Sequence, residues 1–131
     1  MGEPRTVEQL LEAARSRLER ISAVDAAAEQ ANGALIVDTR TEEQRRAQGA
    51  IPHALVIDRT VFEWRLDPTS PWHEPEVTDH DVRIIVMCRQ GYSSSLAAAS
   101  LQDLGLHRAT DVEGGFEAWR AAGLPIESFD A

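Results

Sequence analysis

The sequence predicts an α/β fold in which helices flank a central, mainly parallel sheet. Short apolar runs rich in β-branched residues alternate along the chain with stretches of helical character, a pattern typical of such folds. The runs occupy residues 34–38, 55–57, 82–88 and 109–112. The third run is apolar almost throughout, as expected for a strand that is buried on both faces of a sheet.

The first 20 residues are expected to form an amphipathic helix that packs on a domain comprising residues 21–131. Apolar side chains recur at helical spacing between Thr6 and Arg20, and Thr6 suits the N-cap. Packing within the chain is the commoner use of such an apolar stripe. Docking of a partner protein is the alternative.

A short edge strand is expected at residues 21–24, directly after this helix. Asp25 then suits the N-cap of an alanine-rich helix that ends near Asn32 and Gly33.

The strand at 34–38 is followed by a short helix that ends by Gly49. Thr41 and Gln44 form the capping-box pattern at the start of this helix. The strand at 55–57 comes next, then a helical turn at 61–66 and a proline-rich connection to the strand at 82–88.

In the C-terminal part, an alanine-rich helix at 96–105 precedes the last strand at 109–112. A tight turn at 113–115 leads into a helix at 116–122. Phe116 and Trp119 share one face of this last helix, so we expect Trp119 to be buried and to have a structural role.

The composition fits one domain with a single hydrophobic core, since the chain has 131 residues. Asp and Glu number 22 against 13 Lys and Arg, which gives a net charge of -9 and argues against binding to nucleic acid or to an anionic membrane. The single cysteine excludes an internal disulfide, and no apolar signal segment or membrane span is visible. We therefore expect a cytoplasmic protein, because a free thiol persists in a reducing compartment.

Cys88 is the candidate nucleophile, because it opens a short polar loop between the strand at 82–88 and the following helix. Ligands bind at the carboxyl ends of strands in open parallel sheets. Unpaired backbone N–H groups of the loop and of the helix N-terminus favour a thiolate there. The alternative is that Cys88 is a small buried hydrophobic residue.

Other kinds of site are poorly supported by the sequence. No zinc-ligand spacing, dinucleotide fingerprint or P-loop is present. A cysteine protease would need a histidine partner, and none of the four histidines has a supporting motif. A tyrosine phosphatase would need an arginine six positions after Cys88, where Ser94 stands.

Four motifs in order resemble those of the rhodanese-like sulfurtransferases, over about residues 21–126. They are Leu35–Arg40, Gly49–Ala54, Cys88–Gly91 and Gly114–Trp119. The resemblance implies a three-layer rhodanese-like fold with about five strands. It also implies a double displacement in which Cys88 takes a sulfane sulfur as a persulfide and passes it to an acceptor.

Carried onto this chain, the resemblance makes Cys88 the catalytic residue. The substrate-binding cradle would comprise Arg89, Gln90, Gly91, Tyr92 and Ser93. Asp38 and Arg40 would support it by fixing loops. No metal or cofactor is implied.

The motifs also depart from the family pattern. Ser93 stands where many active members have a cationic residue, so stabilisation of an oxyanionic donor is weakened. Ala50 and His53 also differ from the second motif. Arg89, and Arg59 at the end of a strand, are the candidates for a replacement cation.

The preferred interpretation is a sulfurtransferase that uses a small sulfane donor and a thiol or cyanide acceptor. A protein that relays sulfur would be a further partner, and neither nucleic acid nor membrane is expected to bind. A non-enzymatic binding or regulatory module is the alternative, with a phosphatase-like enzyme third.

Overall fold

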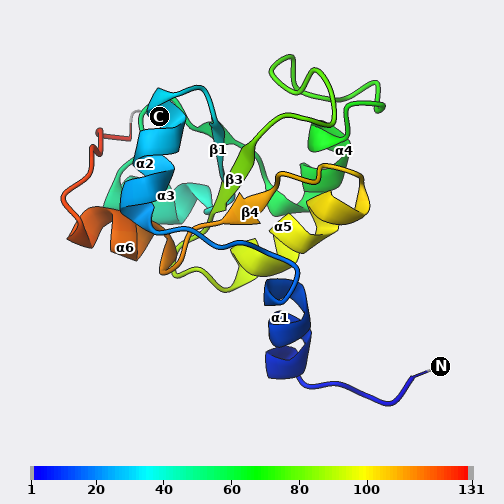
Figure 1. Cartoon of the computed structure of the whole chain (residues 1–131). Coiled ribbons are helices and arrows are strands. Elements are labelled where there is room, and N and C mark those ends of the chain that lie inside the picture. The colour runs from blue at the N-terminus through cyan, green and yellow to red at the C-terminus, as the bar shows by residue number, and fades with distance from the viewer. Residues whose placement is uncertain (1, 130–131) are drawn as a thin grey trace.

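A computed structural model describes residues 2–129 and shows a parallel sheet between two layers of helices (Figure 1). The strands lie in the order β2-β1-β3-β4, and every pairing among them is parallel. They are β1 (Leu35–Asp38), β2 (Leu55–Val56), β3 (Ile84–Met87) and β4 (Thr110–Asp111). The α/β fold is confirmed, with four strands in place of the expected five.

The expected edge strand at 21–24 is reduced to one bridge, between Ile21 and Val112. Helix α2 (Ala23–Ala31) begins inside that stretch, because Ser22 is its N-cap and accepts a hydrogen bond from the Asp25 N–H. Asp25 therefore lies in the first turn of the helix and is not its cap. Because the helix is capped at Ser22, only Ile21 is left to pair with the sheet.

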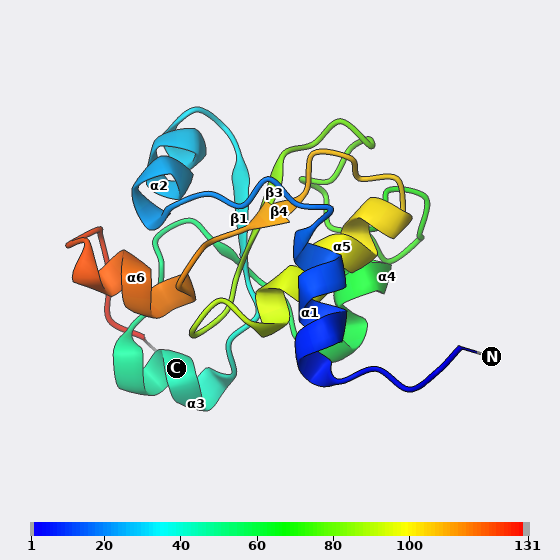
Figure 2. The same cartoon turned by 60° about the horizontal axis from the view of Figure 1, so that its bottom comes forward.

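Helix α1 (Val7–Arg15) begins at a complete capping box between Thr6 and Gln9. It ends earlier than the apolar stripe, which extends to Leu18. Figure 2 shows α1 lying beside α5 (Ser93–Asp103). The N-terminal segment thus packs against the helix that follows the Cys88 loop.

The remaining helices agree with the sequence patterns, except at the start of α5. The Thr41–Gln44 capping box starts α3 (Glu42–Gln48), as expected. The other elements are η1 (Arg59–Val61), α4 (Phe62–Leu66) and α6 (Gly115–Ala121). Helix α5 begins at Ser93, within the stretch expected to be a loop.

The sheet separates two hydrophobic clusters, because side chains alternate along each strand. On one face Ile84 and Val86 pack with residues of α4 and α5. On the other face Ile85 and Met87 pack with residues of α2 and α6. This double burial explains the nearly continuous apolar sequence of β3.

Within residues 2–129, no helix combines the length and the apolar character needed to cross a membrane.

Trp119 is 1% exposed, and its indole N–H donates to the Pro125 carbonyl oxygen at 2.8 Å, so its burial is confirmed. Trp119→Ala should lower the free energy of unfolding by about 3–5 kcal/mol, because it removes a buried ring and leaves a cavity. Urea denaturation measures the change. Trp72→Ala is the control, since Trp72 is 69% exposed. Equal effects of the two substitutions would refute the structural role of Trp119.

Candidate functional site

Cys88 follows β3 directly and lies at the carboxyl edge of the sheet, where β1 also ends. Its side chain is buried, and its Sγ accepts hydrogen bonds from the backbone N–H groups of Gly91 at 3.1 Å and Ser94 at 3.4 Å. Hydrogen bonds to the charged form of a group favour that form. The loop therefore directs two backbone donors at the Cys88 sulfur.

A hollow of about 370 Å³ opens beside Cys88, and we call it the Cys88 hollow. One wall comes from the 88–93 loop and the other from the segment between β1 and α3. The lining residues are Thr39, Arg40, Thr41, Gln44, Cys88, Arg89, Gln90, Tyr92 and Ser93. The structure thus brings together most of the residues expected to form the cradle. Gly91, the other member, contributes its N–H to Sγ.

The loop can turn its N–H groups inward only if its carbonyl groups find partners outside. The N-terminus of α6 supplies two of these partners: Phe116 N–H donates to the Cys88 carbonyl oxygen at 2.8 Å, and Glu117 N–H donates to that of Arg89 at 3.1 Å. The first turn of a helix has N–H groups without partners within the helix, so this contact satisfies both elements.

Gly115 permits this close contact between α6 and the loop. It has φ +57, and a Cβ built on it would lie 2.7 Å from the Gly91 nitrogen and would also collide with the Cys88 carbonyl. Gly91 itself has φ +87 and is similarly enclosed, with the Gly114 nitrogen 2.8 Å from a built Cβ. Both positions therefore require glycine, for space as well as for backbone conformation.

Asp38 and Arg40 form a buried ion pair beneath the opposite wall. The Arg40 guanidinium donates to both Asp38 carboxylate oxygens and to the Gly49 carbonyl oxygen, and it lies 3.7 Å from the centroid of the Phe116 ring. These contacts fix the chain between β1 and α3. Arg40 lines the hollow, but its charge is balanced by Asp38.

The two arginines considered as replacement cations have different positions. Arg89 lines the hollow, yet its guanidinium is paired with Glu117 at 3.2 Å. Arg59 does not line the hollow: it pairs with Glu63 one helical turn later, at 2.9 Å. The structure therefore places Arg59, expected to contribute to the cradle, outside the lining of the hollow.

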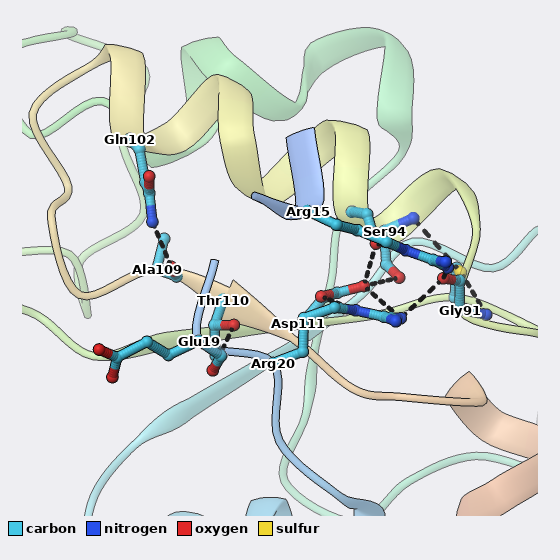
Figure 3. Close-up of polar contacts among 11 residues, drawn as sticks. Arg15, Glu19, Arg20, Gly91, Ser94, Gln102, Ala109, Thr110 and Asp111 are labelled. Carbon is cyan, nitrogen blue, oxygen red and sulfur yellow. Dashed lines mark hydrogen bonds and ion pairs between the residues drawn. The ribbon is translucent and has the colours of Figure 1, made fainter. Parts of the chain in front are cut away.

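Sequence reasoning missed Asp111, which holds the start of α5 (Figure 3). Asp111 is completely buried, and its Oδ2 accepts from the hydroxyl groups of Ser94 at 2.7 Å and Ser95 at 2.8 Å. Arg20 pairs with the same carboxylate at 2.9 Å. The position of Asp111 at the carboxyl end of a parallel strand was the signal that could have revealed it.

The comparisons with known proteins agree with this geometry. A family model described as "Rhodanese-like domain" matches residues 22–122. The chain belongs to the rhodanese-like domain family.

Relatives of this rhodanese-like chain include proteins named "Thiosulfate sulfurtransferase GlpE". That of Actinobacillus succinogenes is 34% identical over 102 residues, which cover 76% of this chain and 80% of the relative. That of Vibrio cholerae serotype O1 is 45% identical over 53 residues, and the match spans 40% of this chain and 50% of the relative. For this second relative the similarity therefore covers only half of its length.

Among solved structures, a protein of unknown function from Rhodopseudomonas palustris, titled "Possible Tyrosine Phosphatase", has a TM-score of 0.85 and 35% identity. The match covers 97% of this chain and 98% of that one. The polysulfide-sulfur transferase homodimer from Wolinella succinogenes has a TM-score of 0.73 and 20% identity, over 94% of this chain and 88% of that one. The second likeness concerns the fold alone.

Gly115→Ala should open the Cys88 loop, because the new methyl group would occupy the space of the loop backbone. We expect a fall in stability larger than the roughly 1–2 kcal/mol that a left-handed conformation costs an alanine, together with a changed rate of Cys88 alkylation. The matched control is Gly123→Ala, with φ +71 and nothing within 4 Å of the built Cβ. If both variants lose the same stability and alkylate alike, the close packing of Gly115 is irrelevant.

Proposed function

We propose that this protein is a sulfurtransferase that moves a sulfane sulfur from a donor to a thiol or cyanide acceptor through a Cys88 persulfide. The observation that carries the proposal is the pair of backbone N–H groups directed at the Cys88 sulfur, at the edge of a hollow that a small molecule can enter. Membership of the rhodanese-like family and the names of the relatives support the same chemistry.

In the first step the Cys88 thiolate attacks the outer sulfur of the donor. With thiosulfate, a new S–S bond forms on Cys88 as the S–S bond of the donor breaks, and sulfite leaves with the electron pair. The persulfide then carries a negative charge on its outer sulfur. Loop N–H groups that stabilise the thiolate also stabilise this anion, because both place charge beside the same donors.

In the second step the acceptor attacks the outer sulfur of the persulfide. Cyanide forms thiocyanate, whereas a thiolate forms a new persulfide. The S–S bond to Cys88 breaks, and its electron pair regenerates the Cys88 thiolate. The cycle needs no oxidant, reductant or metal ion, so the loop and one thiol suffice.

A phosphatase mechanism receives less support from the same site. It would require a guanidinium at position 94 to bind the equatorial oxygens of a phosphate. The Ser94 hydroxyl instead donates to the buried Asp111. This side chain therefore serves the interior of the protein and leaves the hollow without the required charge.

The first test is mass spectrometry of the protein after treatment with thiosulfate or mercaptopyruvate. Wild type should gain the mass of one sulfur atom at Cys88. Cys88→Ser should gain none, since a serine hydroxyl is a far weaker nucleophile near neutral pH. Wild type blocked beforehand with iodoacetamide is the control for adducts elsewhere. No adduct with any sulfane donor would favour a non-enzymatic module over an enzyme.

The second test concerns Ser93, which is exposed at the rim of the hollow. The guanidinium groups that line the hollow are paired with carboxylates, so thiosulfate should bind poorly and show a high KM. Ser93→Arg should lower this KM several-fold with little change in kcat, because the added charge binds ground state and transition state alike. Thr78→Arg adds the same charge on an exposed residue outside the hollow and should leave KM unchanged. A KM that Ser93→Arg raises without disturbing the fold would contradict this account of donor binding.

A further inference from the structure

Two arginines from the N-terminal segment meet at one backbone atom of the 88–93 loop. Arg15 Nη2 donates to the Gly91 carbonyl oxygen at 2.7 Å, and Arg20 Nη2 donates to the same oxygen at 3.0 Å (Figure 3). Arg15 Nε also donates to the Ser95 hydroxyl at 3.1 Å. Both arginines precede residue 22, where the family match begins. The two arginines that contact the loop therefore lie outside the residues matched by the family model.

The Gly91 carbonyl belongs to the peptide unit that links Gly91 to Tyr92. The described residues contain no cis peptide bond, so the Tyr92 N–H points to the opposite side of this unit from the two guanidinium groups. The backbone nitrogen of Gly91 lies on the other side of the same residue, and its N–H donates to the Cys88 sulfur. The two arginine hydrogen bonds to the Gly91 carbonyl thus hold the loop in the conformation in which the Gly91 N–H points at the Cys88 sulfur.

Arg15 differs from the other arginines near Cys88 in that it is not paired with a carboxylate of the described residues. Three other arginines near Cys88 each face a carboxylate: Arg40 faces Asp38, Arg89 faces Glu117, and Arg20 faces Asp111. Arg15 makes no ion pair with any carboxylate of residues 2–129; besides the Gly91 carbonyl it contacts the Ser95 hydroxyl and the ring of Tyr92. It therefore brings an uncompensated positive charge to the back of the loop.

We propose that Arg15 and Arg20 are positioning residues of the 88–93 loop, and that Arg15 supplies from α1 the positive charge that the loop lacks at Ser93. The two arginines contact the loop backbone and do not line the hollow. Arg15 acts on the sulfur anion through the polarised Gly91–Tyr92 peptide and through space. A donor in the hollow still meets no unpaired guanidinium, because Arg40 and Arg89 in its lining are paired with carboxylates, as the Ser93 test assumes.

This inference deepens the proposed function, but its test needs no sulfur transfer. The alkylation rate of Cys88 is measured with neutral iodoacetamide and with anionic iodoacetate, and the ratio of the two rates reports the electrostatic potential at the sulfur. Arg15→Gln should lower the iodoacetate to iodoacetamide ratio roughly two- to five-fold, because it removes one nearby charge. Arg15→Lys keeps the charge and should restore most of the ratio.

The matched control is Arg17→Gln. Arg17 lies just after α1 and pairs with Asp103 of α5 at 2.5 Å, so its loss weakens the same helix contact without touching the loop. An equal ratio in Arg15→Gln and Arg17→Gln would overturn the proposal. Because the readout is alkylation, it stays informative even if the protein transfers no sulfur.

If Arg15→Gln fails to fold, the proposal is tested by the salt dependence of the iodoacetate to iodoacetamide ratio in wild type. An unpaired positive charge near the sulfur makes the ratio fall as salt screens it. The net charge of -9 alone would make the ratio rise, since salt would then relieve repulsion of iodoacetate. A rising ratio would therefore contradict the role of Arg15.

Discussion

The orientation of the backbone between Cys88 and Ser94 is the constraint on which the rest of the site depends. N–H groups that point at one sulfur atom require carbonyl groups that point away from it, because the peptide units are planar and trans. Buried carbonyl groups need partners, since an unpaired one costs free energy. The surroundings of the loop are arranged to provide them.

Two parts of the chain meet this requirement from opposite ends of the sequence. The first turn of α6 donates to the carbonyl groups of Cys88 and Arg89, and the glycines before it allow the necessary approach. The N-terminal arginines donate to the carbonyl of Gly91. The buried Asp111 completes the arrangement, because it binds Arg20 as well as the serines that open α5. The Cys88 sulfur in this way receives N–H donors from the loop, although both arginines that line the hollow are paired with carboxylates.

Much of this arrangement could be predicted from the sequence where the signal is local. The run at 82–88 predicted β3 and the position of Cys88 at the sheet edge, Thr6 was expected as the N-cap of α1, and Thr41 with Gln44 as a capping box. One error has a local cause: Ser22 is the N-cap of α2, so Asp25 lies in the first turn and does not cap the helix. The position of Arg59 is also set locally, because Glu63 lies one turn later, within reach of its guanidinium.

The long-range contacts could not be predicted, for a physical reason. Arg15 and Arg20 bind a main-chain carbonyl more than 70 positions away. Every residue has such a carbonyl, so the residue types do not show which one an arginine binds. Asp111 looked like an ordinary strand residue, because its partners come from α5 and from the segment before α2. Such contacts become visible only once the sheet has brought the segments together.

Under the proposed function, Cys88 holds the transferred sulfur between two separate half-reactions. The direct measurement is to treat the protein with thiosulfate, remove all free donor by gel filtration, add cyanide, and quantify thiocyanate. We expect about one thiocyanate for each Cys88, with recovery of the free thiol, because a single nucleophile carries the covalent intermediate. Thiocyanate that forms only while donor is still present would contradict it, because the sulfur would then never rest on the protein.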